Sequence, residues 1–204
     1  MINFMRSLGI IGWTVLSLTL LGCDDGVDSD KQAEQAYAGL DQAVVNSLQL
    51  GFKGFNEASS ANISPQSATG LLSGTLTITG QVDQGASDNK GMRLRIGMVD
   101  YSDGDITLPE RPTAQVTYET ASDVSLQPEL TLSLRNIPNG TFTGTLSGDF
   151  QMEGDLEGEV ALDVTMSGDI EGDGTGGTQR AVGTTSVIGT ATAQGGVFQI
   201  DITR

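Results

Sequence analysis

Residues 142–170, FTGTLSGDFQMEGDLEGEVALDVTMSGDI, decide the fold of this chain. Every even-numbered position is apolar or glycine, and every odd position except Ala161 is Thr, Ser, Gln, Asp or Glu. A period of two predicts β-structure with one buried face and one solvent-facing surface. A single strand of this length would span roughly 95 Å at about 3.3 Å per residue. Because ordinary strands are far shorter, the stretch has to fold back on itself.

The loop at the fold-back has to keep even positions opposite even positions, because paired residues of antiparallel strands share a face. A three-residue loop at 153–155 satisfies this condition. It predicts Leu146 opposite Leu162 on the buried face and Asp149 opposite Glu159 on the acidic face.

A second three-residue loop at 138–140 has proline at its first turn position and Gly140 at a left-handed position. It adds Leu132 to the buried row of Leu146 and Leu162. The alternative, a two-residue turn at Asn139 and Gly140, would place Leu132 on the acidic face.

Residues 31–56 have the spacing of a helix rather than of a strand. Their apolar side chains fall on one stripe, formed by Tyr37, Leu40, Val44, Leu48, Phe52 and Phe55. The stripe indicates packing against the sheet, and the alternative is an interfacial or partner-binding helix. Residues 23–30 are acidic and polar and are typical of a short tether.

The remainder, residues 69–204, alternates again in several short segments, including a segment at 124–134 that is interrupted by Pro128. The chain is therefore predicted to be mainly β with one N-terminal helix. We expect a strongly curved antiparallel meander of about eight strands, 31–204 forming a single domain. An eight-stranded barrel is filled by its own side chains, so the helix either packs outside a barrel or fills an open half-barrel. A weak ten-residue sequence repeat in residues 141–170 leaves a solenoid fold as a further alternative.

The N-terminus carries the most specific motif. Arg6 precedes an apolar segment, residues 8–21, that is typical of a secretory signal, and the segment ends in Leu20-Leu21-Gly22-Cys23. This ending resembles the lipobox of bacterial lipoproteins. In that family the cysteine is acylated and the signal is cut off before it, which implies cleavage between Gly22 and Cys23 and removal of residues 1–22.

The same resemblance implies where the protein resides. Acyl chains on Cys23 would anchor it to a membrane of the bacterial cell envelope, facing the periplasm or the cell exterior. The following Asp24 resembles the retention signal of inner-membrane lipoproteins in enteric bacteria, and other lineages sort differently, so both membranes stay open. The alternative interpretation makes Cys23 a stray thiol after a plain signal.

The composition excludes several kinds of chemistry. The chain has no histidine and one cysteine, so a histidine base, a histidine-containing triad, an imidazole metal site and an intramolecular disulfide are absent. The formal charge of −16 argues against nucleic acid as a partner. We expect neither enzymatic activity nor a cofactor.

Acidic residues are the remaining candidates for a site. The cross-strand acids Asp149 and Glu159 and the run Asp169, Glu171 and Asp173 are candidate cation ligands. The run resembles the opening of a calcium-binding EF-hand loop, but Arg180 stands where that loop has its glutamate, so an EF-hand is not supported. Asp100, Asp103 and Asp105 form a second acidic turn. Plain solvation is the alternative at all of these positions.

Two functions follow from this fold. The half-barrel resembles periplasmic lipid and lipoprotein carriers at the level of fold, which predicts a lipid-anchored, non-enzymatic protein that binds a lipid or another apolar ligand. The inward glycines 144, 148, 158 and 168 would leave room for it. The predicted groove is lined by Tyr37, Leu40, Val44, Leu48, Phe52, Leu132, Leu146 and Leu162. The alternative is a structural or surface-interaction lipoprotein with a filled core, with a protein partner or divalent cations on its acidic face.

Overall fold

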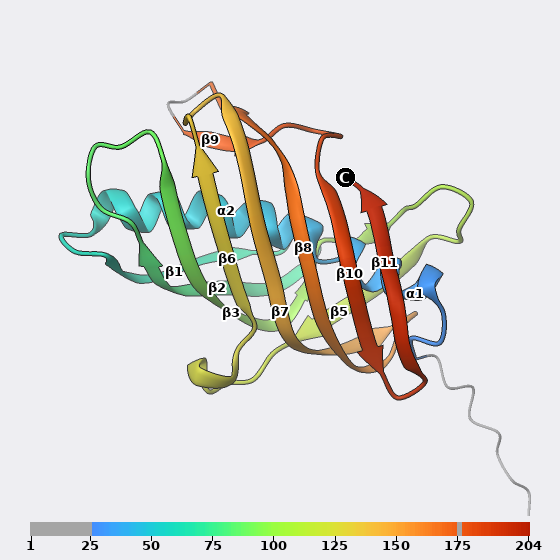
Figure 1. Cartoon of the computed structure of the whole chain (residues 1–204). Helices are drawn as coiled ribbons and strands as arrows, with labels where there is room; N and C mark the ends of the chain where they lie inside the picture. Colours follow the sequence, from blue (N-terminus) through green and yellow to red (C-terminus); the bar gives the residue numbers. More distant parts are fainter. Residues whose placement is uncertain (1–25, 175–176) are drawn as a thin grey trace, which may run out of the picture.

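The computed structural model describes residues 26–174 and 177–204. One antiparallel sheet of eleven strands curves around two consecutive helices (Figure 1). The elements are α1 (Asp30–Ala38), α2 (Asp41–Glu57), β1 (Asn62–Thr69), β2 (Ser73–Val82), β3 (Lys90–Ser102), β4 (Asp105–Ile106), β5 (Ala114–Glu119), η1 (Val124–Leu126), β6 (Glu129–Arg135), β7 (Gly140–Gly154), β8 (Gly158–Gly172), β9 (Thr178–Arg180), β10 (Ser186–Ala193) and β11 (Gly196–Thr203).

The main path of the sheet runs β1-β2-β3-β5-β7-β8-β10-β11, in chain order, and β4, β6 and β9 lie off it. The predicted fold class, a mainly antiparallel meander packed on an N-terminal helical segment, is confirmed. The sheet has eleven strands, against about eight predicted, because β1, β4 and β9 were not predicted. The solenoid alternative is wrong, because each long strand pairs with its sequence neighbours in one continuous antiparallel sheet.

The alternation in 142–170 is confirmed residue by residue. The large even-numbered side chains are buried and the odd-numbered ones are exposed or half-buried. The buried ones are Phe142, Leu146, Phe150, Met152, Leu156, Val160, Leu162, Val164, Met166 and Ile170. They form the concave face of the sheet, and the acids of the same strands form the convex face.

The pairing of β7 with β8 differs by two residues from the prediction. Leu146 lies opposite Val164, not opposite Leu162. The reason is that β7 does not turn where the short loop would begin: it continues to Gly154, which pairs with Val116 of β5. A shift of two residues leaves every side chain on its predicted face.

The pairing of β6 with β7 is displaced in the same way. Leu130, and not Leu132, lies opposite Leu146, while Leu132 lies opposite Gly144. The predicted row of Leu132, Leu146 and Leu162 is therefore wrong, although all three are buried. The left-handed residue of this loop is Asn136, with φ 57°, and not Gly140, and the two-residue alternative is excluded because Leu132 faces the core.

Strands β5 and β6 occupy the same layer position between β3 and β7. β5 pairs with β3 only at Tyr101 and Tyr118, whereas β6 pairs with β3 from Lys90 to Arg95. Residues 120–128 connect the two strands and leave the plane of the sheet. The predicted strand over 124–134 is thus wrong for its first part, where Val124–Leu126 is a 3-10 turn.

The predicted helical segment is confirmed, and it breaks at Gly39. The Tyr118 hydroxyl donates a 2.9 Å hydrogen bond to the carbonyl of Ala36, which an unbroken helix would offer to the Leu40 N–H. Leu40 N bonds to the Tyr37 carbonyl instead. Glycine suits this position because a Cβ there would collide with the Tyr118 hydroxyl.

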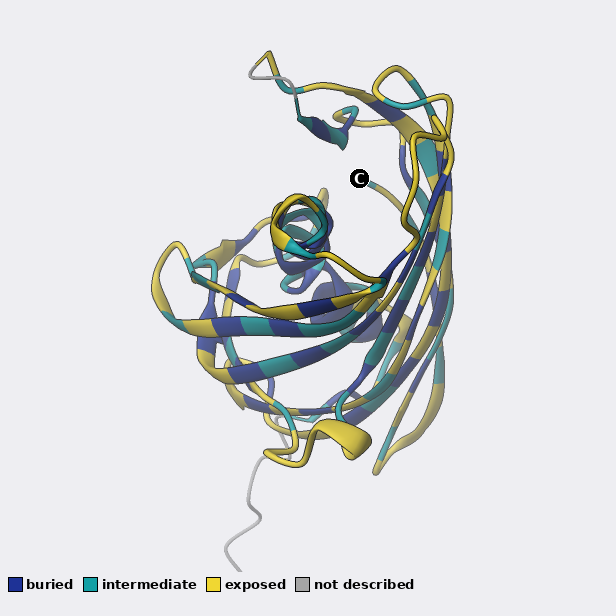
Figure 2. Cartoon of the chain, turned by 90° about the vertical axis from the view of Figure 1, so that its left-hand side faces the viewer, coloured by how far each residue is buried: buried dark blue, intermediate teal, exposed yellow. Residues whose placement is uncertain are grey.

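The helices fill the concave side of an open half-barrel, as Figure 2 shows in the view along α2. α2 contacts β1, β2 and β3 on one flank and β9 on the other, and α1 contacts β11. β1 and β11 end the sheet and do not pair with each other. Of the two expected arrangements, the half-barrel wrapped on the helix is confirmed. The packed part of the chain also starts before residue 31, since Val27 of the predicted tether is buried.

Candidate functional site

The predicted apolar groove is filled by the helical segment. Tyr37, Leu40, Val44 and Leu48 are each no more than 2% exposed. Phe52 is half-buried at the end of the stripe and packs against the same core. These residues come together as predicted, but they act as packing between the helices and the sheet.

The inward glycines do not leave the expected volume free. A Cβ at Gly144 would lie 2.7 Å from Leu132 Cδ2, and one at Gly148 would lie 2.6 Å from Pro128. Neighbouring side chains and backbone of the sheet thus occupy the space at both positions. Gly168 is likewise within contact distance of Phe142 and Thr185, so three of the four glycines mark close approaches within the sheet.

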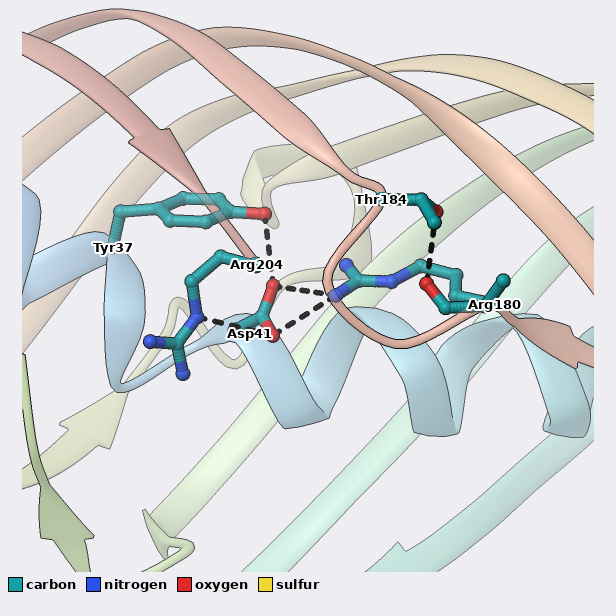
Figure 3. A network of polar contacts seen from close by, with 6 residues as sticks. Tyr37, Asp41, Arg180, Thr184 and Arg204 are labelled. Atoms are coloured by element: carbon teal, nitrogen blue, oxygen red, sulfur yellow. Dashed lines mark hydrogen bonds and ion pairs between the residues drawn. The ribbon is translucent and has the colours of Figure 1, made fainter.

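A buried ionic network joins the helices to the end of the chain (Figure 3). Arg180 Nη2 donates to both carboxylate oxygens of Asp41 at 2.9 Å. Arg204 Nε lies 3.5 Å from Asp41 Oδ2, and the Tyr37 hydroxyl donates to Oδ1 at 3.4 Å. Asp41 opens α2, while Arg180 ends β9 and Arg204 follows β11, so one carboxylate ties α2 to the C-terminal flank.

This network has more donors than acceptors. Arg180 Nε and Nη1 are buried and have no hydrogen-bond partner, and two guanidinium groups surround one carboxylate. A cavity of about 520 Å³ adjoins the network, and Gln42, Val45, Gln179 and Val182 also line it. Removing the carboxylate would leave a buried positive charge unpaired. A substitution at Asp41 should therefore weaken the attachment of α2 to the C-terminal flank of the sheet.

All three tyrosines are buried and keep their protons. Burial raises the pKa of Tyr37, with the nearby Asp41 carboxylate adding to the shift. Burial also raises the pKa of Tyr118, and for Tyr101 burial acts together with a hydrogen bond to Asp103. The three hydroxyl groups thus serve as hydrogen-bond donors that fix helices and loops, not as bases.

The predicted acidic pair does not form. Asp149 lies opposite Ala161, and Glu159 lies opposite Gln151. The two-residue shift of register separates the carboxylates that the tight loop would have paired. The predicted direct repulsion between Asp149 and Glu159 is therefore wrong.

Two of the three acids of the run at the end of β8 accept hydrogen bonds from the residues that follow the strand. Glu171 accepts a 3.2 Å hydrogen bond from Gln179, and Asp173 accepts one of 2.8 Å from Gly177 N. Asp169 lies opposite Thr141 on the convex face. Within residues 26–174 and 177–204, no group of three or more acidic, cysteine or histidine side chains is placed to hold a metal ion.

The second acidic turn is also structural. Asp103 accepts hydrogen bonds from the Tyr101 hydroxyl and from Leu71 N, and Asp105 accepts one from Gln115. These bonds hold the β1–β2 turn and β4 in place. They account for the Asp103 and Asp105 carboxylates without a ligand.

Sequence reasoning missed Asp41, Arg180 and Arg204 as a unit. A signal was present, because Arg180 and Arg204 are the only basic residues after Arg135. Their partner lies 139 positions before Arg180, and nothing in the local pattern connects the two.

Comparison with known proteins does not assign this chain to a family. No family model, curated protein or solved structure matches the chain. In the described part of the chain, no helix combines the length and apolarity needed to cross a bilayer. The predicted cleavage and acylation positions, Gly22 and Cys23, lie outside the described residues.

Proposed function

We propose that this chain is a non-enzymatic, lipid-anchored protein of the bacterial cell envelope that acts as a surface-interaction module. The anchor rests on the lipobox-like sequence Leu20-Leu21-Gly22-Cys23. The observation that favours an interaction module over a lipid carrier is the filled concave face, on which the side chains of the helical stripe are at most 2% exposed from Tyr37 to Leu48.

A carrier needs an apolar volume that opens, and the contacts of the helices argue against opening. Tyr118 binds the Ala36 carbonyl, Gln35 donates to the Pro112 carbonyl at 2.9 Å, and Asp41 binds Arg180. These contacts fix the segment on both sides of its break at Gly39. Displacing it would expose the core and leave buried polar groups unpaired.

A fatty-acid binding titration tests the module against the carrier. The purified full chain, in nonionic detergent below its critical micelle concentration, is titrated with a fluorescent fatty acid. We expect no saturable binding, because the stripe and the sheet neighbours occupy the concave volume. Saturable binding that a Leu48→Trp substitution abolishes would overturn the module in favour of a carrier.

Metabolic labelling with a palmitate analogue tests the anchor separately. Cys23→Ala should remove the label and leave the precursor uncut, since Cys23 is the only cysteine. Leu71→Ala, at an exposed turn of the folded part, should leave both labelling and processing unchanged. Labelled, processed Cys23→Ala protein would contradict the lipoprotein assignment.

A further inference from the structure

Residues 120–128, here called the outer loop, project from the convex face of the sheet between β5 and β6 (Figures 1 and 2). Leu126 in this loop is 68% exposed, and Val124 is also exposed. Val99 of β3, beside the loop, is 61% exposed. Three large apolar side chains are therefore exposed on the outer surface where the layer between β3 and β7 is interrupted.

The outer loop is held in one conformation. At its start, Thr120 N donates to the Met98 carbonyl at 3.2 Å and the Thr120 hydroxyl accepts from Met98 N at 2.9 Å. At its end, the carbonyl of the buried Pro128 accepts from Ile96 N at 2.9 Å. Both ends thus replace the missing strand pairing with β3.

Bonds within the loop add to this order. Asp123 accepts hydrogen bonds from the backbone N–H and the hydroxyl of Ser125 at 2.9 and 2.8 Å. Gln127 Nε2 donates to the Ala121 carbonyl at 3.1 Å, and Arg95 Nη1 donates to the Gln127 carbonyl at 2.9 Å. A rigid loop presents its apolar groups without the ordering penalty that a flexible loop would incur on binding.

Two hollows flank the outer loop and share Glu119, Thr120 and Ala121 as walls. The first, of about 420 Å³, is lined by Val99. The second, of about 410 Å³, is lined by Leu126. Each hollow thus has one exposed apolar side chain in its wall, Val99 in the first and Leu126 in the second.

The rim of the second hollow is acidic. Glu119 and Glu159 stand on either side of Gln151 in one cross-strand row, and Asp149 lines the same hollow. None of the ion pairs formed among the described residues includes these three carboxylates. Arg95 contacts the outer loop through the Gln127 carbonyl, but its guanidinium is already paired with Glu129 at 2.9 Å.

We propose that the outer loop and its two hollows form a docking surface for a basic partner protein, which contributes an apolar side chain flanked by lysine or arginine. The apolar side chain packs against Leu126 in the second hollow, and the cations meet the Glu119, Asp149 and Glu159 carboxylates on its rim. The acidic rim selects this partner over an anionic lipid surface or nucleic acid, which it would repel. The proposal rests on the interaction module of the preceding subsection.

A labelled synthetic peptide of alternating lysine and leucine serves as the probe, and anisotropy of its label reports binding to the purified full chain. Leu126→Ser should weaken binding about tenfold, which corresponds to about 1.4 kcal/mol, because the substitution removes an apolar side chain that the partner would bury. Leu71→Ser removes a leucine of the β1–β2 turn that is 78% exposed and should change binding less than twofold.

A matched pair of charge variants separates the rim from the overall negative charge. Glu119→Gln with Glu159→Gln should weaken binding about fivefold, since each exposed charge pair contributes modestly. Asp163→Asn with Asp201→Asn neutralises two other exposed acids of the sheet and should change binding less than twofold. Equal effects of the two charge pairs, or no effect of Leu126→Ser, would overturn the docking surface.

The assay is independent of the anchor and of the fatty-acid test. Absence of saturable peptide binding at low salt would overturn the docking surface, while Cys23 labelling would still decide the lipoprotein assignment. A peptide in which glutamate replaces every lysine should not bind, and its binding with the same affinity would also overturn the proposal.

Discussion

Asp41→Asn should be among the most destabilising conservative substitutions in this protein. The change keeps the size of the side chain and removes its charge. Arg180, which is only 7% exposed in its side chain, would lose its carboxylate partner, and Arg204 would lose its nearest acid. The two guanidinium groups would then repel each other in a partly dehydrated site.

The magnitude follows from burial. Removing one partner of a buried ion pair costs about 3–5 kcal/mol, because the other charge stays desolvated and uncompensated. Asp41 is 13% exposed in its side chain and borders a cavity, so water can offset part of the loss. We expect about 3 kcal/mol, which corresponds to a fall in Tm of about 6–12 °C for a chain of this size.

Thermal and urea unfolding of the purified chain measure this effect, and Glu129→Gln is the matched control. The Arg95–Glu129 pair has the same nitrogen–oxygen distance, 2.9 Å, but its side chains are 38% and 44% exposed. Exposed pairs contribute about 0–1 kcal/mol. Glu129→Gln should therefore lower the unfolding free energy by less than about 1 kcal/mol.

Two results would refute the reasoning. The first is an equal loss in Asp41→Asn and Glu129→Gln, which would show that burial of the Asp41 pair has no energetic consequence. The second concerns the double variant Asp41→Leu with Arg180→Met, which removes both charges and should recover most of the loss. A double variant as unstable as Asp41→Asn would locate the effect in local packing and not in the unpaired guanidinium.

Two further predictions test the faces of the sheet and the buried tyrosines. Leu146→Asp should lower the free energy of unfolding in urea by several kcal/mol, because it buries an unpaired charge on the concave face. Thr145→Asp on the convex face should lower it by less than about 1 kcal/mol. Equal losses at the two positions would contradict the alternating faces. Because burial raises the pKa of Tyr37, Tyr101 and Tyr118, the folded protein should keep these protons above pH 10 while the unfolded chain releases them. Stability should then be unaffected by the tyrosines below pH 10 and fall above it by about 1.4 kcal/mol per pH unit for each tyrosine, and tyrosinate absorbance that rises before unfolding would contradict their burial.

The faces of the sheet could be predicted from the sequence, but the pairing register could not. A period of two fixes which side chains share a face, and a shift of two residues changes no face. The choice between Leu162 and Val164 as the partner of Leu146 therefore depends on something outside the hairpin. It depends on β5, which pairs with Gly154 and keeps β7 extended into the predicted loop at 153–155.

Elements without the alternating pattern were the ones missed. β1 contains Pro65 and Gln66 and has a register irregularity between Ile63 and Gln66, so its sequence carries little strand signal. Residues 124–126, by contrast, contain Val124 and Leu126 and look like the start of a strand. Buried Pro128 marks the point where pairing begins, and the apolar residues before it project into solvent.

The long-range contacts of the helical segment also could not be predicted from the sequence. The break at Gly39 was not predicted, because it depends on the distant Tyr118 hydroxyl, which binds the Ala36 carbonyl. The candidate site at Asp41 likewise needs Arg180 and Arg204 from the last strands. Local periodicity contains no information about partners so far apart in the chain.

The distribution of charge links the fold to the proposed function. Because the even positions of 142–170 are committed to the core, the acids on strands β7 and β8 emerge on the convex face. The sequence has no basic residue between Arg135 and Arg180, and Arg180 and Arg204 are both paired with Asp41 of α2. The same alternation that builds the half-barrel therefore leaves negatively charged side chains close together on its outer surface, where they repel one another. A basic partner at the outer loop would relieve that repulsion at a place where apolar groups are already exposed.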